Sequence, residues 1–255
     1  MSTPTCILIT GASGAIGGAL AREYAAPGVT LILQGRNRVV LDTLATECAA
    51  CGAQPHIVCL DVRDVGGLRR WAGQMVQDTL PDLVIANAGM NIDIGPGGAG
   101  ERWEDIEALW EVNVQAVMAL IDVVLPAMRA RRNGQIAIMS SLAAYFGLPV
   151  TPSYCASKAA VKAYGEALRG WLAPEGIRVN VIMPGYVDSP MCRAMPGPKP
   201  FLWTPERAAR VIRRGLEKNR ARIAFPFPLH LGTWFLAVLP AEVSTRIVRW
   251  LGYRG

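Results

Sequence analysis

The sequence predicts an α/β fold, in which a doubly wound parallel sheet of about seven strands carries helices on both faces. Short apolar runs without helical periodicity alternate with longer stretches of helix-compatible spacing. Turns rich in glycine or polar residues follow the apolar runs, as they do in parallel strands that are buried on both faces. Strands that alternate with helices in this way build a parallel sheet through right-handed crossovers.

The composition is that of a single domain over residues 1–255. Hydrophobic residues make up 51% of the 255 positions, which is enough for a large core and excludes a disordered chain. The six cysteines are scattered, and the first residues lack the basic and apolar segments of a secretion signal. We therefore expect a reduced, cytoplasmic protein. The two histidines stand in unrelated contexts, so no metal site is expected.

The net charge of +6 comes mainly from residues 206–222, which hold seven basic residues and two glutamates. A nucleic-acid site would combine such charge with exposed aromatic residues or a reading motif, and neither is present. We expect no nucleic-acid partner and interpret the segment as a solvated helix face. Attraction to anionic lipid is the alternative.

The first strand, Cys6–Thr10, leads into a glycine-rich turn and a helix. Glycines at this place let the backbone approach a phosphate at the helix N-terminus, where unpaired N–H groups point outward. The alternative is a tight turn that binds nothing. The residues expected to hold a dinucleotide here are Gly11, Ser13, Gly14, Ala15, Ile16 and Gly17.

The end of the second strand, residues 30–34, indicates which dinucleotide binds. An acidic residue near this point accepts hydrogen bonds from the ribose 2′-hydroxyl of NAD, whereas a basic residue accommodates the 2′-phosphate of NADP. The chain offers Gly35 and Arg36 and no carboxylate, so it favours NADP over NAD. The alternative for Arg36 is a solvent-exposed loop residue.

The third and fourth strands, residues 56–60 and 82–86, end in further polar turns. Ligands of doubly wound sheets lie beyond the carboxyl ends of the strands, so these turns should line the dinucleotide site. Asp61 has the alternative role of capping the next helix, and Asn87 that of stabilising its turn. The site residues expected from these turns are Asp61, Val62, Asn87, Ala88 and Gly89.

A long helix is predicted from about Trp103 to Arg131, with Asn113 inside it. Asparagine is unfavourable within a helix because its side chain competes for backbone hydrogen bonds. Its position among valines therefore indicates a local distortion or a buried polar role.

The next strand, residues 135–139, places Ser140 and Ser141 at the same edge of the sheet, and a helix that begins near Pro152 brings Tyr154 and Lys158 there. Residues four apart share one helix face, so the Lys158 charge can lower the pKa of the Tyr154 hydroxyl. A Tyr-x-x-x-Lys spacing by itself is also common by chance. A sixth strand, residues 178–182, ends before Pro184 and Gly185.

These motifs, taken in order, resemble the short-chain dehydrogenase/reductase family, in its shorter branch with a Ser-Tyr-Lys active site. The resemblance extends from about Cys6 to Gly185. It implies a Rossmann-like fold, a homodimer or homotetramer, and hydride transfer between nicotinamide and a carbonyl or secondary alcohol. The family serine precedes its tyrosine by thirteen positions, which selects Ser141 over Ser140.

The resemblance also assigns roles to the four expected catalytic residues. Tyr154 exchanges the proton with the substrate oxygen, and Ser141 donates a hydrogen bond to it. Lys158 bonds the nicotinamide ribose, and Asn113 holds a water in a proton relay. Two features depart from the family pattern: Ala15 occupies the usual position of the middle glycine, and no acidic residue stands at Gly35. The spacing of Gly14 is that of longer members, which include sugar-nucleotide epimerases.

The residues after Gly185 are expected to complete the nicotinamide and substrate sites. Pro184, Gly185, Val187 and Ser189 should contact the cofactor, and residues 186–205 should form a substrate loop. Apolar residues of this segment suggest a lipophilic substrate, although packing in the core explains such residues equally well. They are Met191, Met195, Phe201, Leu202 and Trp203.

Residues 223–255 form an apolar C-terminal extension. No Asp, Glu, Lys or Arg occurs from Ile223 to Ala241, but prolines in this stretch argue against a membrane span. We expect the last strand near Ile223 and then an apolar helix. That helix packs in the core or on another subunit, or it rests on a membrane surface, for which the inner face of a membrane is the location to expect.

The sequence thus predicts an NADP-dependent oxidoreductase that acts on a small-molecule substrate, a lipophilic carbonyl compound or secondary alcohol. Two alternatives remain open. One is a sugar-nucleotide type of epimerase with tightly bound NAD, suggested by the Gly14 spacing. The other is a dinucleotide-binding module without turnover.

Overall fold

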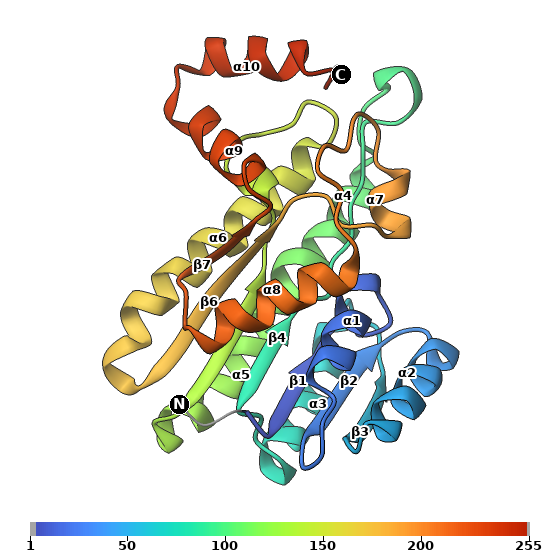
Figure 1. Cartoon of the computed structure of the whole chain (residues 1–255), viewed down its shortest axis with the longest axis vertical. Helices are drawn as coiled ribbons and strands as arrows, with labels where there is room; N and C mark the ends of the chain where they lie inside the picture. Colours follow the sequence, from blue (N-terminus) through green and yellow to red (C-terminus); the bar gives the residue numbers. More distant parts are fainter. Residues whose placement is uncertain (1–3, 254–255) are drawn as a thin grey trace.

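Seven strands form one parallel sheet in the order β3-β2-β1-β4-β5-β6-β7 in the computed structural model, which describes residues 4–253 (Figure 1). The order reverses between β1 and β4, and this reversal creates the crevice in which doubly wound sheets bind ligands. The predicted fold class is confirmed. The strands are β1 (Cys6–Ile9), β2 (Thr30–Gly35), β3 (Gln54–Cys59), β4 (Leu83–Ala86), β5 (Gly134–Met139), β6 (Ile177–Pro184) and β7 (Arg222–Phe225).

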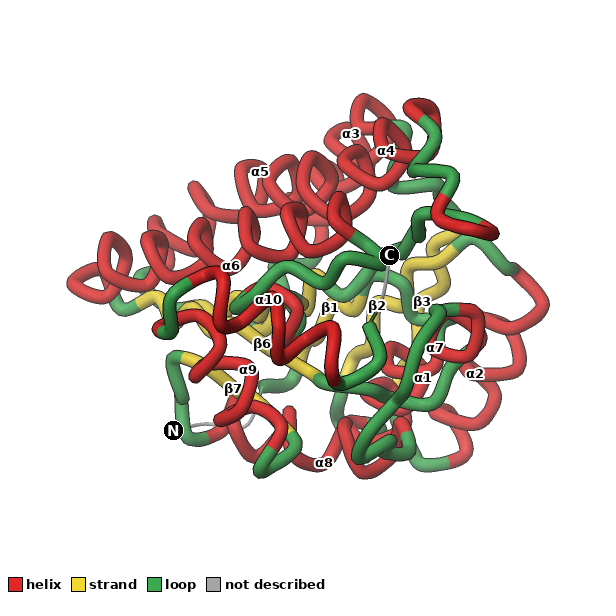
Figure 2. The backbone as a smooth tube through the Cα atoms, turned by 90° about the horizontal axis from the view of Figure 1, so that it is seen from above, coloured by secondary structure: helices red, strands yellow, loops and turns green. Residues whose placement is uncertain are grey.

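Helices cover both faces of the sheet (Figure 2). One face carries α1 (Ala15–Tyr24), α2 (Arg38–Ala50) and α8 (Pro205–Glu217). The opposite face carries α3 (Val65–Asp78), α4 (Trp103–Trp110), α5 (Ala116–Arg131) and α6 (Pro152–Leu172). Short 3₁₀ turns lie at η1 (Pro96–Gly98), η3 (Leu142–Ala144) and η4 (Ala173–Glu175).

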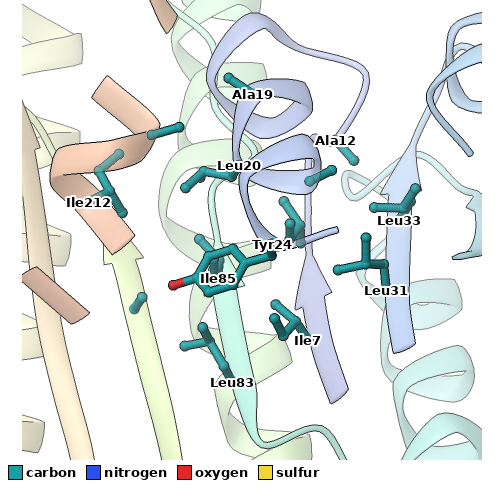
Figure 3. Close-up of a cluster of buried hydrophobic side chains, with 14 of the residues drawn as sticks. Ile7, Ala12, Ala19, Leu20, Tyr24, Leu31, Leu33, Leu83, Ile85 and Ile212 are labelled. Atoms are coloured by element: carbon teal, nitrogen blue, oxygen red, sulfur yellow. The ribbon is translucent and has the colours of Figure 1, made fainter. Parts of the chain in front are cut away.

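Side chains that alternate along each strand supply the two halves of the core. Ile7 and Ile9 of β1 pack with α1 and α8, whereas Leu8 packs on the opposite face with α3 and α5. Figure 3 shows the first cluster, in which Leu20 of α1 and Ile212 of α8 cover the strands. Because both faces are buried, the central strands β1 and β4 are apolar at nearly every position, which is why they lack a visible period of two in the sequence.

The predicted long helix contains a π-helical turn, η2 (Glu111–Gln115), between α4 and α5. Asn113 lies in this turn and is fully buried, which confirms the distortion expected at this residue. The run Trp103–Arg131 is long and apolar enough to cross a membrane, yet 61% of its most apolar window is buried inside the protein. It packs on the sheet and on α3, so its hydropathy is that of a core helix.

The basic segment forms α8 and the approach to β7. Ala208, Ile212 and Leu216 of α8 are fully buried against the sheet and α1, while Arg213 pairs with Glu217 at 3.0 Å on the outer side. This arrangement agrees with the interpretation of a solvated helix face.

The C-terminal residues add β7 to the sheet edge, which confirms the strand expected near Ile223. Two helices follow in place of the single one expected, α9 (Leu229–Val238) and α10 (Ala241–Trp250). Figure 1 shows both beyond the carboxyl end of β7, at the top of the molecule, whereas α7 (Pro190–Ala194) lies lower on the right.

Candidate active site

A cavity of about 940 Å³ follows the carboxyl edge of the sheet from the glycine turn to α10. It is lined by every site residue predicted from the sequence except Asn113, which lies behind the wall. The cavity has a polar end at the β1–α1 turn and an apolar end at the C-terminal helices. Ser141, Tyr154 and Lys158 lie on its wall between the two ends, together with Pro184 and Gly185.

The glycine turn permits a very close approach of backbone segments. Gly11 has a φ of +64°, which favours glycine, and a Cβ on Gly17 would lie only 2.3 Å from the carbonyl oxygen of Gly11. Gly14 precedes α1 without a side-chain cap, and the first turn of α1 contains no acidic residue. The N–H groups of Ala15 and Ile16 at this end are therefore available to an anion such as a dinucleotide phosphate.

Thr10 and Asn87 hold the glycine turn against the neighbouring strand. The Asn87 side chain donates to the carbonyl oxygens of Thr10 at 2.8 Å and Gly11 at 3.3 Å. The Thr10 hydroxyl oxygen in turn accepts from the backbone N–H groups of Asn87 and Ala88, each at 3.0 Å. Asn87 thus stabilises the turn while it lines the cavity, so the functional and the structural interpretation both apply to it.

The end of β2 carries no side chain at Gly35. A Cβ there would lie 2.8 Å from the hydroxyl oxygen of Ser13, so a side chain here would displace Ser13. Next to it, the Arg36 guanidinium is 70% exposed and lies 3.7 Å from a carboxylate oxygen of Asp61, which is a loose, solvated ion pair. An exposed cation and a hydroxyl group therefore border this end of the cavity.

The turn after β3 also lies on the cavity wall through Asp61 and Val62. Asp61 accepts a hydrogen bond from the Arg63 N–H at 3.0 Å. The cap of α3 is Asp64 instead, whose carboxylate accepts from the Gly67 N–H at 2.8 Å. The alternative role of Asp61 as the helix cap is therefore wrong.

Tyr154 and Ser141 come together because η3 and α6 meet at the end of β5. Ser141 begins η3, where its hydroxyl oxygen accepts from the Ala143 N–H at 3.1 Å, and it forms a hydrogen bond with the Tyr154 side chain. Tyr154 stands in the first turn of α6. A substrate oxygen placed between the two hydroxyl groups would reach both.

Lys158 is 3% exposed and has no carboxylate partner among residues 4–253. Its ammonium group donates to the Met139 carbonyl oxygen at 3.1 Å and lies 5.6 Å from the centre of the Tyr154 ring. Gly89 makes space for it, because a Cβ there would lie 3.2 Å from the Lys158 Nζ. A buried cation is therefore held next to the tyrosine with hydrogen-bonding capacity to spare.

Burial, and not the lysine, dominates the pKa values of this pair. It raises the pKa of Tyr154 to about 12, although the hydrogen bond with Ser141 acts in the opposite direction. It lowers the pKa of Lys158 to about 8. The expected lowering of the tyrosine pKa by Lys158 is thus not found in the protein by itself, because desolvation penalises the charged form of each group.

Asn113 connects three segments from behind the cavity wall. Its amide oxygen accepts from the Met90 N–H at 2.9 Å, and its amide nitrogen donates to the Met90 carbonyl at 2.9 Å and to the Ser157 hydroxyl at 3.0 Å. Both amide hydrogens are therefore used within the protein. The predicted relay water remains a prediction, whereas the observed contacts fix the loop after β4 and the α6 helix.

The start of α6 is held by a residue that the sequence did not single out. The Glu101 carboxylate accepts from the Ser153 N–H at 3.2 Å and from the Ser153 hydroxyl. A carboxylate at a helix N-terminus is stabilising, and this one fixes the residue next to Tyr154. No local pattern could reveal it, because the two residues are 52 positions apart.

The substrate loop forms one side of the apolar end. Met191 and Met195 line the cavity, in agreement with the expected lipophilic wall. Trp203 does not line it and stacks on Phe225 with ring centres 5.1 Å apart, so packing in the core explains this residue. Phe201 and Leu202 are about half exposed and also lie outside the lining. Val187 and Ser189 lie on the wall, and the Ser189 hydroxyl oxygen accepts from the Cys192 N–H at 3.0 Å.

The C-terminal extension forms the other side, which the sequence did not predict. Leu229, Leu236 and Val248 belong to the cavity lining. The chain end is attached to the substrate loop by Tyr253, whose hydroxyl lies 2.6 Å from that of Tyr186 and donates to the Pro198 carbonyl at 2.8 Å. No group of residues suited to a metal ion occurs within residues 4–253.

Comparisons with known proteins identify relatives of the whole chain. The family model described as short chain dehydrogenase matches residues 5–197. A protein of Myxococcus xanthus described as an uncharacterized oxidoreductase is 34% identical over 236 residues, with 91% of this chain and 92% of that protein covered. The ketoacyl reductase HetN of a Nostoc species is 29% identical over 262 residues, with 98% and 90% covered.

Solved structures reproduce the whole fold. A short-chain dehydrogenase from Sphingobium yanoikuyae, determined in complex with NADPH, superimposes with a TM-score of 0.80 at 24% identity. The match covers 98% of this chain and 96% of that one. The fold likeness therefore includes the C-terminal helices as well as the sheet.

Proposed function

Because this chain belongs to the short-chain dehydrogenase/reductase family of NAD(P)-dependent oxidoreductases, we propose that it reduces the carbonyl group of a lipophilic substrate with NADPH. The observation that carries the proposal is the Ser141–Tyr154–Lys158 group on the cavity wall, between a phosphate-binding turn and an apolar chamber. The reverse reaction, oxidation of the secondary alcohol, uses the same groups.

The nicotinamide cofactor supplies or accepts the hydride. The residues that fit it are those of the polar end, where the first turn of α1 offers free N–H groups and Gly11 and Gly17 provide a close backbone approach. Lys158 reaches the same wall with unused donor capacity, which suits a ribose hydroxyl.

Ser141 and Tyr154 hold the substrate oxygen and move its proton. Ser141 donates a hydrogen bond and positions the oxygen, and Tyr154 gives its proton to the alkoxide as it forms. Since burial keeps the pKa of Tyr154 near 12, the tyrosine is protonated at neutral pH and is ready to act as an acid. The buried Lys158 cation beside it stabilises the phenolate that the transfer leaves behind.

The preference for NADP is supported by Gly35, Ser13 and Arg36 together. No carboxylate stands at Gly35 to bind the 2′-hydroxyl of NAD, and a side chain there would displace Ser13. Arg36, which is only loosely paired with Asp61, can turn to a 2′-phosphate, and the Ser13 hydroxyl adds a donor.

Replacement of Arg36 tests this preference. Arg36→Ala should lower kcat/KM for NADPH by about 10- to 100-fold, the equivalent of one charge-assisted hydrogen-bonding group, and leave that for NADH nearly unchanged. Arg38→Ala is the matched control, because Arg38 pairs with Asp42 outside the cavity. Equal losses with both cofactors would contradict the preference.

A lipophilic substrate is supported by the apolar end of the cavity, whose walls come from the substrate loop, α9 and α10. In a series of ketones of increasing chain length, kcat/KM with NADPH should rise until the chamber is filled. A preference for small polyols would contradict this substrate class.

Neither alternative function has support beyond the Gly14 spacing. If the protein were an epimerase with tightly held NAD, denaturing the purified protein would release NAD. If it were a binding module without turnover, Tyr154→Phe would leave its biological role intact.

A further inference from the structure

The helix α9 (Leu229–Val238) presents an apolar stripe to the outside. Leu231, Trp234 and Val238 follow one another at helical spacings of three and four residues, and they are 49%, 44% and 57% exposed. The helix has no charged residue and no buried residue. A helix that is apolar all round requires cover on every side.

The opposite side of α9 is already covered by the protein itself. Leu229, Thr233 and Leu236, again at spacings of four and three residues, are half-buried and line the cavity. The outer stripe therefore cannot turn inward without opening the cavity. What covers it must come from outside this chain.

The helix α10 (Ala241–Trp250) continues the apolar surface. Ser244 and Val248 face inward and are buried, whereas Val243 and Trp250 are 41% and 82% exposed. Arg246 stands three residues after Val243 and four before Trp250, so it borders this apolar strip. We call the exposed apolar residues of both helices, with one neighbouring residue before α9 and one after α10, the α9–α10 surface: Phe227, Leu231, Trp234, Phe235, Val238, Val243, Trp250 and Leu251. Of these, Phe235 and Leu251 also line the cavity.

The size of the α9–α10 surface argues against a second copy of the chain as its cover. Each helix has ten residues and is about 15 Å long, so at a width of about 10 Å the two present roughly 300 Å². A stable protein interface takes about 800 Å² from each partner. The helices also lie at the top of the molecule, away from the flat faces of the body (Figure 1).

The charges and aromatic residues around this surface fit an anionic lipid headgroup layer. Arg246 and Arg249 have no ion-pair partner among residues 4–253, and Glu242 is the single acidic residue of the sequence from 223 to 253. Tryptophan prefers the boundary between headgroups and acyl chains, and the surface contains Trp234 and Trp250. Apolar side chains bordered by free arginines are typical of helices that lie in a membrane surface.

We propose that the α9–α10 surface docks the protein on anionic phospholipid bilayers, with both helices in the plane of the headgroups. The docking goes beyond the proposed reaction and does not depend on it. In this orientation the apolar end of the cavity is next to the lipid, because the same α9 helix forms its wall.

Vesicle sedimentation of the full-length protein tests the proposal. The wild-type protein should bind phosphatidylcholine vesicles that contain phosphatidylglycerol and bind vesicles of phosphatidylcholine alone several-fold less. The variant Leu231→Ser/Trp234→Ser/Trp250→Ser should lose at least about tenfold in partition coefficient. The variant Arg246→Gln/Arg249→Gln should lose the preference for anionic vesicles and its sensitivity to salt.

The matched control is Val39→Ser/Trp103→Ser, which removes exposed apolar side chains that are 74% and 66% exposed on α2 and α4. It should bind vesicles as the wild type does. None of the three residues changed on α9 and α10 lines the cavity, so NADPH should still raise the melting temperature of that variant, which shows that it is folded. Absence of vesicle binding by the wild type, equal binding by the triple variant, or a triple variant that changes the oligomeric state in light scattering would each overturn the proposal.

Discussion

The two ends of the cavity are built in different ways. At the cofactor end, backbone segments pack directly on one another, and Gly17 lies against the Gly11 carbonyl. Thr10 and Asn87 connect the ends of β1 and β4 through four hydrogen bonds. At the substrate end, apolar side chains form the walls, and the polar contacts of Tyr253 attach the chain end to the substrate loop.

Because of this difference, substitutions should have different effects at the two ends of the cavity. At the cofactor end the shape depends on the absence of side chains, so a single added methyl group displaces the backbone. At the substrate end the shape depends on the size of side chains, so substitutions there alter the space available without moving the sheet. Binding of the cofactor should therefore be intolerant of change, and substrate choice should be adjustable.

The largest effect is expected where the two ends meet. Tyr154→Phe removes the proton donor and should lower kcat by about 10²- to 10⁴-fold, while NADPH affinity changes little. Stopped-flow measurement of NADPH oxidation and a fluorescence titration separate the two quantities. Tyr164→Phe is the control, because Tyr164 lies on the same helix outside the cavity lining. A Tyr154→Phe enzyme with full activity would refute the role of Tyr154.

The second largest effect is expected from a methyl group added at the cofactor end. Gly17→Ala would place Cβ 2.3 Å from the Gly11 carbonyl oxygen, so the turn must shift and the Kd for NADPH should rise about 10- to 100-fold. Gly73→Ala in α3 is the control, because nothing lies within 4 Å of a Cβ there. The control should retain NADPH affinity and gain about 0.5–1 kcal/mol in stability. Unchanged NADPH binding by Gly17→Ala would show that the turn is adaptable.

The cofactor end could be predicted from the sequence because its signals are local. The glycine turn, Asp61, Asn87 and the Tyr154–Lys158 spacing each follow directly from a strand or helix, and parallel strands bring their ends to one edge. The pKa of Tyr154 could not be predicted, because desolvation depends on segments that pack over it from other parts of the chain.

The buried lysine should cost the apo protein stability. Its pKa is lowered from 10.5 to about 8, so the unfolded chain binds the proton more tightly. The loss of folding free energy caused by the buried Lys158 charge is fully present below about pH 8 and disappears as the pH rises to 10.5. Lys158→Met should therefore raise the free energy of unfolding at pH 7 by about 2 kcal/mol and abolish activity. Urea unfolding without cofactor at pH 7 and pH 10 measures the difference, which should shrink at the higher pH. A destabilised variant at pH 7 would contradict this account.

The smallest effect is expected at the substrate end. Tyr253→Phe removes the hydroxyl that contacts Tyr186 and the Pro198 carbonyl, so the wall loosens and KM for a bulky ketone should rise about three- to tenfold. The KM for NADPH should not change. Tyr24→Phe, which alters a tyrosine in the core cluster around α1, is the control. An equal rise in both KM values would mean that the two ends are not independent.

The C-terminal wall of the substrate end could not be predicted, because α9 carries apolar residues on all sides. Its cavity-facing Leu229 and Leu236 are as apolar as the outward-facing Leu231, so hydropathy does not mark the inner side. Tertiary contacts alone decide which side faces the cavity. The role of Glu101 could not be predicted either, because this residue binds the start of α6 from a loop that is distant in the sequence.

The π-helical turn at Glu111–Gln115 sets the rotational phase between α4 and α5. A π-helical turn contains about one residue more than an α-helical turn, so the loss of one residue here would leave a regular α-helix from α4 into α5, and α5 would keep its packing on the sheet. Asn113 would lose the widened turn from which it bonds Met90 and Ser157. The extra residue of this segment therefore serves the buried contacts of Asn113, which connect the helix that carries Tyr154 with the loop after β4.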